Sequence, residues 1–185
     1  MVMAEATNHY FKHLGVSDGL SQVCIPSIYQ DELGAVWLGT TEGLNRYNGK
    51  DVKVFQPSES NHGLTNNEIN ELCGDKNGRM YIRSGNDLIK LDIYTEQFTC
   101  LRQKGVYGLF CKKDTLWVSC ADGIYYYTGQ GTELTFFARV QKGFVGRALY
   151  VDRETVWVVT RKYLVAISRE DPLRQEILLT LDKGN

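Results

Sequence analysis

The sequence lacks several features that would point to common classes of function. Its 185 residues carry a net charge of −1 and no basic block, so we expect no nucleic acid partner. No apolar run approaches the ~18 residues of a membrane-spanning helix, so we expect no direct membrane contact by this segment. Residues 1–6 lack the apolar core of a signal peptide, so the chain is either cytosolic or has lost its signal.

Histidine and cysteine give no catalytic pattern either. The histidines are His9, His13 and His62, and none belongs to a repeated motif that could position a base. The five cysteines are an odd number, so at least one is unpaired. Cys73 and Cys111 occupy matching places in successive repeats, before the hairpin that leads to a repeated aromatic residue. We interpret these cysteines, with the others in strand-like runs, Cys24, Cys100 and Cys120, as small core residues.

What the sequence does contain is a hairpin pattern that recurs four times. In residues 36–47, β-branched and aromatic residues flank Thr-Glu-Gly, and Gly43 supplies the left-handed position of the turn. Further copies cover residues 81–91, 117–127 and 157–167. The leading aromatic residues, Trp37, Tyr81, Trp117 and Trp157, follow one another at intervals of 44, 36 and 40 residues. Strand-rich repeats of about 40 residues are typical of propeller blades.

Helical periodicity is absent, and strand-like runs separated by turn signals surround each hairpin. We predict an all-β fold, a β-propeller built of four-stranded antiparallel blades. About four blades are present, at residues 18–61, 62–102, 103–140 and 141–185. Strands are expected at residues 23–30, 35–40, 44–48 and 52–55 in the first blade and at 68–73, 79–84, 88–92 and 97–101 in the second. The outer strands of the last two blades are expected at 134–138 and 176–181.

The recurring aromatic residues are best explained by packing between blades, because both faces of a blade are buried against its neighbours. Each such ring can bury roughly 150–250 Å². The spacing from Asp31 through Gly34 to Trp37 recurs from Asp75 to Tyr81, and we interpret it as a turn motif. One carboxylate per turn falls short of the six to eight oxygens that calcium prefers. We therefore predict no metal site and no cofactor.

Four short sequence segments of the first blade resemble the two-component regulator propeller repeat. They are Asp-Gly-Leu-Ser at 18–21, Ile-Tyr-Gln-Asp at 28–31, Gly-Ala-Val-Trp-Leu-Gly-Thr at 34–40 and Glu-Gly-Leu-Asn-Arg-Tyr at 42–47. The second blade keeps the spacing but has Tyr-Ile-Arg-Ser at 81–84 where Trp-x-Gly-Thr is usual, and the last two blades match weakly. The repeat builds the periplasmic sensor regions of hybrid two-component systems in Bacteroides-type bacteria, which sense breakdown products of complex glycans.

The resemblance implies that this chain is a periplasmic, ligand-sensing segment that binds an oligosaccharide and has no catalytic residues of its own. Two alternatives stay open. A propeller can serve as a scaffold for protein interactions, and related repeats resemble those of streptogramin lyases, which are enzymes. A sugar sensor should show aromatic and amide residues converging on one rim, whereas a scaffold should show an exposed apolar patch.

Propellers bind ligands on the rim formed by the turns between second and third strands and by the segments that lead into the inner strands. The candidates in the turns are Glu42, Asn86, Asp87, Asp122, Arg161 and Tyr163. The candidates in the segments that lead into the inner strands are Asn66, Tyr107 and Arg147. Planar and amide groups suit sugar hydroxyls, so these nine residues are the predicted ligand-binding set.

The resembled family uses about seven blades in a ring, which needs on the order of 280 residues. Four blades therefore predict an incomplete ring with exposed faces at its two ends. A run at residues 10–14, within an N-terminal extension of residues 1–17, reads as an isolated strand without a hairpin partner. We expect the chain to self-associate or to pack against the remaining blades of a longer protein. A small four-bladed ring that closes on itself is the competing arrangement.

Overall fold

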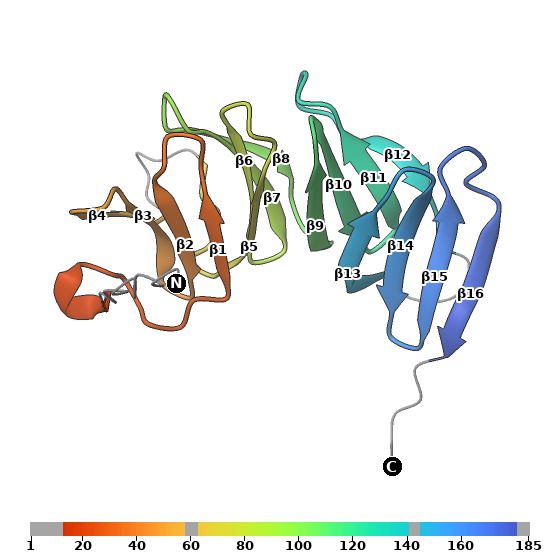
Figure 1. Ribbon diagram of the computed structural model, residues 1–185, viewed down its shortest axis with the longest axis horizontal. Coiled ribbons are helices and arrows are strands. Elements are labelled where there is room, and N and C mark those ends of the chain that lie inside the picture. Colours follow the sequence, from red (N-terminus) through yellow and green to blue (C-terminus); the bar gives the residue numbers. More distant parts are fainter. Residues whose placement is uncertain (1–12, 58–62, 141–144, 181–185) are drawn as a thin grey trace, which may run out of the picture.

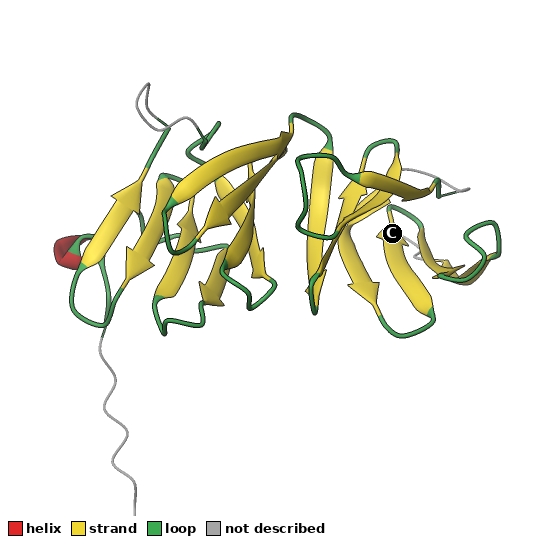
Figure 2. Ribbon diagram, turned by 90° about the horizontal axis from the view of Figure 1, so that it is seen from above, coloured by secondary structure: helices red, strands yellow, loops and turns green. Residues whose placement is uncertain are grey.

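The structure is a computed structural model that describes residues 13–57, 63–140 and 145–180, without the side chains of residues 145–148. Strands dominate these ranges, and the short 3-10 helix η1 (Val16–Asp18) is the one helical segment visible in Figure 2. In the same ranges, no helix is long and apolar enough to span a lipid bilayer.

In the described residues, sixteen strands form four separate four-stranded sheets, which we call blades 1 to 4. Blade 1 contains β1 (Ser27–Gln30), β2 (Val36–Thr40), β3 (Gly43–Tyr47) and β4 (Val52–Phe55). Blade 2 contains β5 (Ile69–Gly74), β6 (Arg79–Ser84), β7 (Asp87–Asp92) and β8 (Gln97–Arg102). Blade 3 contains β9 (Val106–Lys112), β10 (Thr115–Cys120), β11 (Gly123–Tyr127) and β12 (Thr135–Ala138). Blade 4 contains β13 (Val145–Val151), β14 (Thr155–Thr160), β15 (Tyr163–Ser168) and β16 (Gln175–Thr180).

Within each blade the strands pair antiparallel in the order of the chain, so every blade is a simple meander. The blades follow one another along an open arc, with blade 1 and blade 4 at opposite ends (Figure 1). The predicted all-β propeller of four-stranded blades is therefore confirmed, and the arrangement is that of an incomplete ring.

The structure corrects the sequence predictions at three places. The first strand begins at Ser27 rather than at residue 23, because Pro26 has no backbone N–H to donate to a ladder. Each hairpin between second and third strands closes with two turn residues, so Gly43 is already paired in β3 with Thr40. The strand predicted at residues 10–14 lies mostly outside the described residues, and its two described members are not in a strand.

The four recurring aromatic residues are structurally equivalent, as the sequence predicts. Each lies in the second strand of its blade, three residues before the last residue of that strand. Their partners on the first strands are Tyr29, Cys73, Phe110 and Tyr150, and those on the third strands are Arg46, Lys90, Tyr126 and Ala166.

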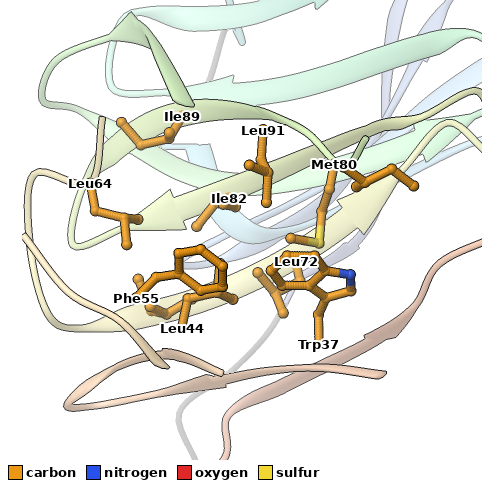
Figure 3. Close-up of a cluster of buried hydrophobic side chains, with 11 residues drawn as sticks. Trp37, Leu44, Phe55, Leu64, Leu72, Met80, Ile82, Ile89 and Leu91 are labelled. Carbon is orange, nitrogen blue, oxygen red and sulfur yellow. The ribbon is translucent and has the colours of Figure 1, made fainter. Parts of the chain in front are cut away.

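The first three of these aromatic residues each pack on the blade that follows their own. Trp37, with Leu44 and Phe55 of blade 1, packs against Met80 and other apolar side chains of blade 2 (Figure 3). Tyr81 packs in the same way on blade 3, and Trp117 packs on blade 4. The core is therefore divided into three layers that lie between blades, and successive layers hold the arc together.

Blade 4 has no following blade among the described residues, and its recurring aromatic residue is more exposed than those of the other blades. Trp157 is only half-buried, whereas Trp37 is fully buried and Trp117 is 4% exposed. Strand β16 exposes Ile177, Leu178 and Leu179 by 40%, 45% and 53%. Blade 4 thus presents apolar side chains to solvent at one end of the arc.

Candidate ligand-binding rim

The turns between second and third strands lie at the same end of every blade, and we call this end the turn rim. Its two-residue turns are Thr41-Glu42, Gly85-Asn86, Ala121-Asp122 and Arg161-Lys162. The segment that leads into each inner strand reaches the same end, because the inner strand runs antiparallel to the second strand. The sequence prediction of a common rim therefore follows from the meander topology.

Blades 2 and 3 meet on this rim through the segment that precedes β9. The N–H of Val106 donates to the Asn86 carbonyl at 3.0 Å, and the N–H of Lys104 donates to the Asp87 carboxylate at 2.6 Å. On the other side of the segment, the N–H of Ala121 donates to the Gly105 carbonyl at 2.8 Å. The turns of two neighbouring blades are thus joined by one backbone segment, which fixes their relative positions.

Asp122 lies at the blade 3 side of this junction in a small polar cluster. The Arg102 guanidinium contacts one carboxylate oxygen of Asp122 at 2.8 Å, and the Tyr125 hydroxyl donates to the other oxygen at 2.7 Å. Arg102 also lies over the Tyr125 ring, 4.6 Å from its centroid. Burial opposes the charged form of Asp122, but the hydrogen bonds from Tyr125 and Arg102 outweigh it and lower the pKa of this carboxyl.

Asn66 and Tyr107 complete the group at this junction. The N–H of Asn66 donates to the Ser84 hydroxyl at 3.0 Å, and that hydroxyl donates back to the Asn66 carbonyl at 2.8 Å. The Asn66 side chain lies beside Gly85, where an added Cβ would be 3.1 Å from the amide nitrogen. Tyr107, which is half-buried, directly follows the hydrogen-bonded Val106. The segments that carry five of the predicted residues therefore meet where blades 2 and 3 join: Asn66, Asn86, Asp87, Tyr107 and Asp122.

The other four predicted residues do not join this group. Glu42 is exposed on blade 1, and its carbonyl accepts a 2.8 Å hydrogen bond from the Gln56 side chain. Arg161 and Tyr163 lie on blade 4, away from the junction of blades 2 and 3, and Tyr163 packs partly on the layer between blades 3 and 4. Arg147 is the third residue of β13, inside the inner strand, and its side chain is outside the described part.

Sequence reasoning missed a partly buried ion pair beneath the junction, formed by Arg83 and Glu71. Arg83 in β6 is 6% exposed and contacts the Glu71 carboxylate of β5 at 3.4 Å. The same Glu71 oxygen accepts a 3.1 Å hydrogen bond from the N–H of Leu109 in β9, so it ties blade 2 to the inner strand of blade 3. A signal was present, because Arg83 stands where blade 1 has Gly39. A charged residue at a buried repeat position needs a partner.

The Arg83 side chain also reaches the turn. Its guanidinium donates to the Gly85 carbonyl at 3.1 Å, and the Asn70 amide donates to the same carbonyl at 3.2 Å. The side chains of Arg83 and Asn70 thus both stabilise the turn of blade 2. Asn86 lies in this turn, and its side chain is exposed. Among the described residues, the Asn86 amide has no hydrogen-bond partner.

A hollow lies on blades 3 and 4, at the end opposite the turn rim. Its volume is about 480 Å³, and Arg169 covers the Trp117 ring there at 5.5 Å from the centroid. It is lined by Thr115, Trp117, Tyr126, Thr128, Phe137, Arg153, Arg169 and Glu170. The sequence analysis assigned these aromatic residues to packing between blades, and Trp117 does pack there. Across the described ranges, no three His, Cys, Asp or Glu side chains gather as metal ligands would.

Comparison with known proteins supports the class of protein that the blades define. Residues 19–42 match the family described as Two component regulator propeller. A histidine kinase (P4) of Formosa agariphila is 40% identical over 53 residues, which cover 29% of this chain and 4% of that protein. The repeat resemblance seen in the first blade is therefore confirmed.

Two solved structures share the fold at low identity. The extracellular domain of a Bacteroides thetaiotaomicron protein described as a hybrid two component system has a TM-score of 0.75 at 21% identity, covering 91% of this chain and 26% of that one. A second extracellular domain from the same organism, described as a one component system, has a TM-score of 0.72 at 19% identity, covering 94% and 28%. The blades of this chain thus share the propeller fold of these two domains, and the chain spans about a quarter of the length of each.

Proposed function

We propose that this chain is a ligand-binding propeller segment of an extracytoplasmic two-component sensor and that its ligand is a fragment of a complex glycan. The observation that carries the proposal is that the turn and inner-strand segments bearing amide, carboxylate and aromatic residues meet at the junction of blades 2 and 3. Asn66, Asn86 and Tyr107 come from three different segments, and backbone hydrogen bonds hold these segments together. The periplasmic location of the repeat family and the extracellular domains of similar fold support an extracytoplasmic site.

The chemistry of the junction suits a sugar. Amide groups both donate to and accept from hydroxyls, and the Tyr107 ring supplies an apolar face for the C–H side of a pyranose. The fixed turns limit the ordering that binding would require. Binding without turnover is the expected activity, since His13, the one histidine among the described residues, is exposed before blade 1.

A calorimetric screen of glycan fragments against the purified chain tests this function. One class of oligosaccharide should release heat, and Asn86→Ala and Tyr107→Ala should each weaken its binding by roughly tenfold. Tyr94→Ala is the matched control, because Tyr94 is 62% exposed in the turn between β7 and β8, at the opposite end of blade 2. The substitutions Arg161→Ala and Tyr163→Ala test whether blade 4 contributes to glycan binding.

The possible outcomes of the screen test the proposed function and the proposed binding site separately. Turnover of a screened compound would replace the sensor by an enzyme, as in the streptogramin-lyase alternative. Binding that persists in all four rim variants would overturn the rim assignment and leave the function standing. A complete screen without heat would contradict the glycan ligand.

A scaffold is the second candidate, and a specific observation favours it. The exposed apolar side chains of β16 and the half-buried Trp157 form a surface that suits protein contact, either with a second copy or with further blades. Light scattering tests whether this surface associates, and the calorimetric screen tests separately whether the rim binds a glycan.

A further inference from the structure

Blades 2 and 3 bring two cysteines together that the sequence analysis assigned separately to the core. The Sγ atoms of Cys73 in β5 and Cys111 in β9 are 2.8 Å apart, and the Cys111 thiol donates to the Cys73 sulfur. This separation is about 0.8 Å longer than a disulfide bond. In the described ranges all five cysteines are free thiols.

The register explains why these two side chains face each other. Cys73 pairs with Tyr81, the repeated aromatic residue, and therefore points with it towards blade 3. Cys111 pairs with Leu116, one residue before Trp117, so it points the opposite way, towards blade 2. The sequence prediction that the two cysteines are equivalent is thus wrong by one residue. That offset is what turns their sulfurs towards one another.

At the other two blade junctions, different side chains lie between the neighbouring inner strands. Between blades 1 and 2, the Tyr29 hydroxyl approaches Gly74 so closely that an added Cβ would lie 2.1 Å from its oxygen. Between blades 3 and 4, the rings of Phe110 and Tyr150 meet at 5.1 Å between centroids. Aromatic rings therefore bridge those junctions, whereas two small thiols in contact bridge the middle one.

We propose that Cys73 and Cys111 are a modification site at which a disulfide bond joins the inner strands of blades 2 and 3. The oxidant is a small-molecule or protein disulfide. A thiolate of one cysteine attacks the oxidant, its S–S bond breaks, and a mixed disulfide forms. The second cysteine then displaces the remaining oxidant thiol. Two electrons and two protons leave the cysteines, and the oxidant ends as two thiols.

The surroundings support a slow and specific exchange. Cys73 and Cys111 each keep part of their residue surface exposed, whereas Cys120 is fully buried. Burial, the hydrogen bond with Cys111 and the nearby Glu71 carboxylate raise the pKa of the Cys73 thiol. Since the thiolate is the reactive form, oxidation should accelerate as the pH rises. The site rests on geometry alone and does not depend on the proposed ligand.

Oxidation of the full chain with excess oxidised glutathione tests the proposal. After alkylation and tryptic digestion, mass spectrometry should find the Cys73 and Cys111 peptides linked, whereas the exposed Cys24 should be alkylated or carry glutathione. Because the bond closes a loop between residues 73 and 111, the Tm of the oxidised chain should exceed that of the reduced chain by roughly 10 °C.

Two variants sharpen the result. Cys100→Ala removes another half-buried cysteine and should keep both the link and the Tm difference, whereas Cys111→Ala should lose both. Comparing oxidised with reduced wild-type protein keeps the test valid even if Cys111→Ala does not fold. The proposal is overturned if both peptides remain alkylated after oxidation, if either cysteine links to Cys24 or Cys100, or if the linked chain has the lower Tm.

Discussion

The indole N–H of Trp37 donates a 2.7 Å hydrogen bond to the carboxylate of Asp31, six residues earlier in the same blade. The other oxygen of Asp31 accepts from the N–H groups of Leu33 and Ala35, at 3.0 and 2.9 Å. One carboxylate therefore closes the first hairpin and orients the ring that packs on the next blade. Blade 4 repeats the arrangement between Trp157 and Asp152 at 2.6 Å, so the turn motif has a defined structural role there too.

Removing this carboxylate should destabilise the propeller. Asp31 is 4% exposed, so Asp31→Ala leaves buried donors without an acceptor and should lower the free energy of unfolding by about 2–3 kcal/mol. Urea unfolding followed by tryptophan fluorescence measures the change. Asp51→Ala, at an exposed turn, is the control and should change stability by no more than about 0.5 kcal/mol. Equal effects of the two substitutions would contradict the role of Asp31.

The repeated aromatic residues should differ in their energetic contribution according to the blade that follows them. Trp117→Ala opens a cavity against blade 4 and should cost about 3–5 kcal/mol. Trp157→Ala should cost less than half of that, because this ring is half-buried at the open end of the arc. Chemical denaturation of both variants tests the ranking. A larger loss for Trp157→Ala would show that another surface covers blade 4.

Stability should fall in acid because several carboxyls titrate at lower pH in the folded chain. The pKa of Asp122 is lowered by Tyr125 and Arg102 against the effect of burial, and that of Asp152 is lowered chiefly by Trp157. A lowered folded pKa contributes stability above the ordinary value of 3.8, and this contribution is lost as the pH falls through the folded value. The urea midpoint should therefore be level near neutral pH and drop below about pH 4.

Asp122→Asn isolates one part of this dependence. The amide keeps the shape of the side chain but cannot titrate, so the acid-induced drop in the urea midpoint should become shallower. A pH profile identical to that of the wild type would exclude a contribution from the Arg102 cluster.

The apolar end of the arc should mediate self-association. Leu178 and Leu179 on β16 are 45% and 53% exposed, and edge strands pair readily with other chains. Light scattering should show a mass that rises with concentration, and Leu179→Lys should reduce it towards 21.0 kDa. Glu176→Lys, on the same strand but already polar, is the control for added charge. A wild-type chain that stays monomeric at all concentrations would refute this prediction.

Most of the fold could be predicted from the sequence because the signal is repeated. The spacing of Trp37, Tyr81, Trp117 and Trp157 reflects one buried position per blade, and four copies of a weak pattern reinforce one another. The register between first and second strands was harder to predict. It depends on the length of the first hairpin, which differs between blades 2 and 3, and this difference reverses the direction of Cys111.

The candidate site was only partly predictable. Topology alone places Asn86 and Tyr107 on one rim, since turns and inner-strand approaches share an end of each blade. The repeat position of Arg83 indicates that its charge needs a partner, but it does not identify Glu71, which also accepts from the backbone N–H of Leu109 in the next blade. Contacts between blades depend on the rotation from one blade to the next, which a repeat pattern does not specify.

The central claim, that a glycan fragment binds where blades 2 and 3 meet, is tested most directly by NMR titration of the ¹⁵N-labelled chain. Oligosaccharides that bind in the calorimetric screen should shift the backbone amides of Asn66, Asn86 and Tyr107 together, along one saturation curve. The amides of Tyr94 and Asn48, remote from this junction, should stay in place. Shifts confined to blade 4 or to the hollow around Arg169, with the three rim amides unmoved, would contradict the account.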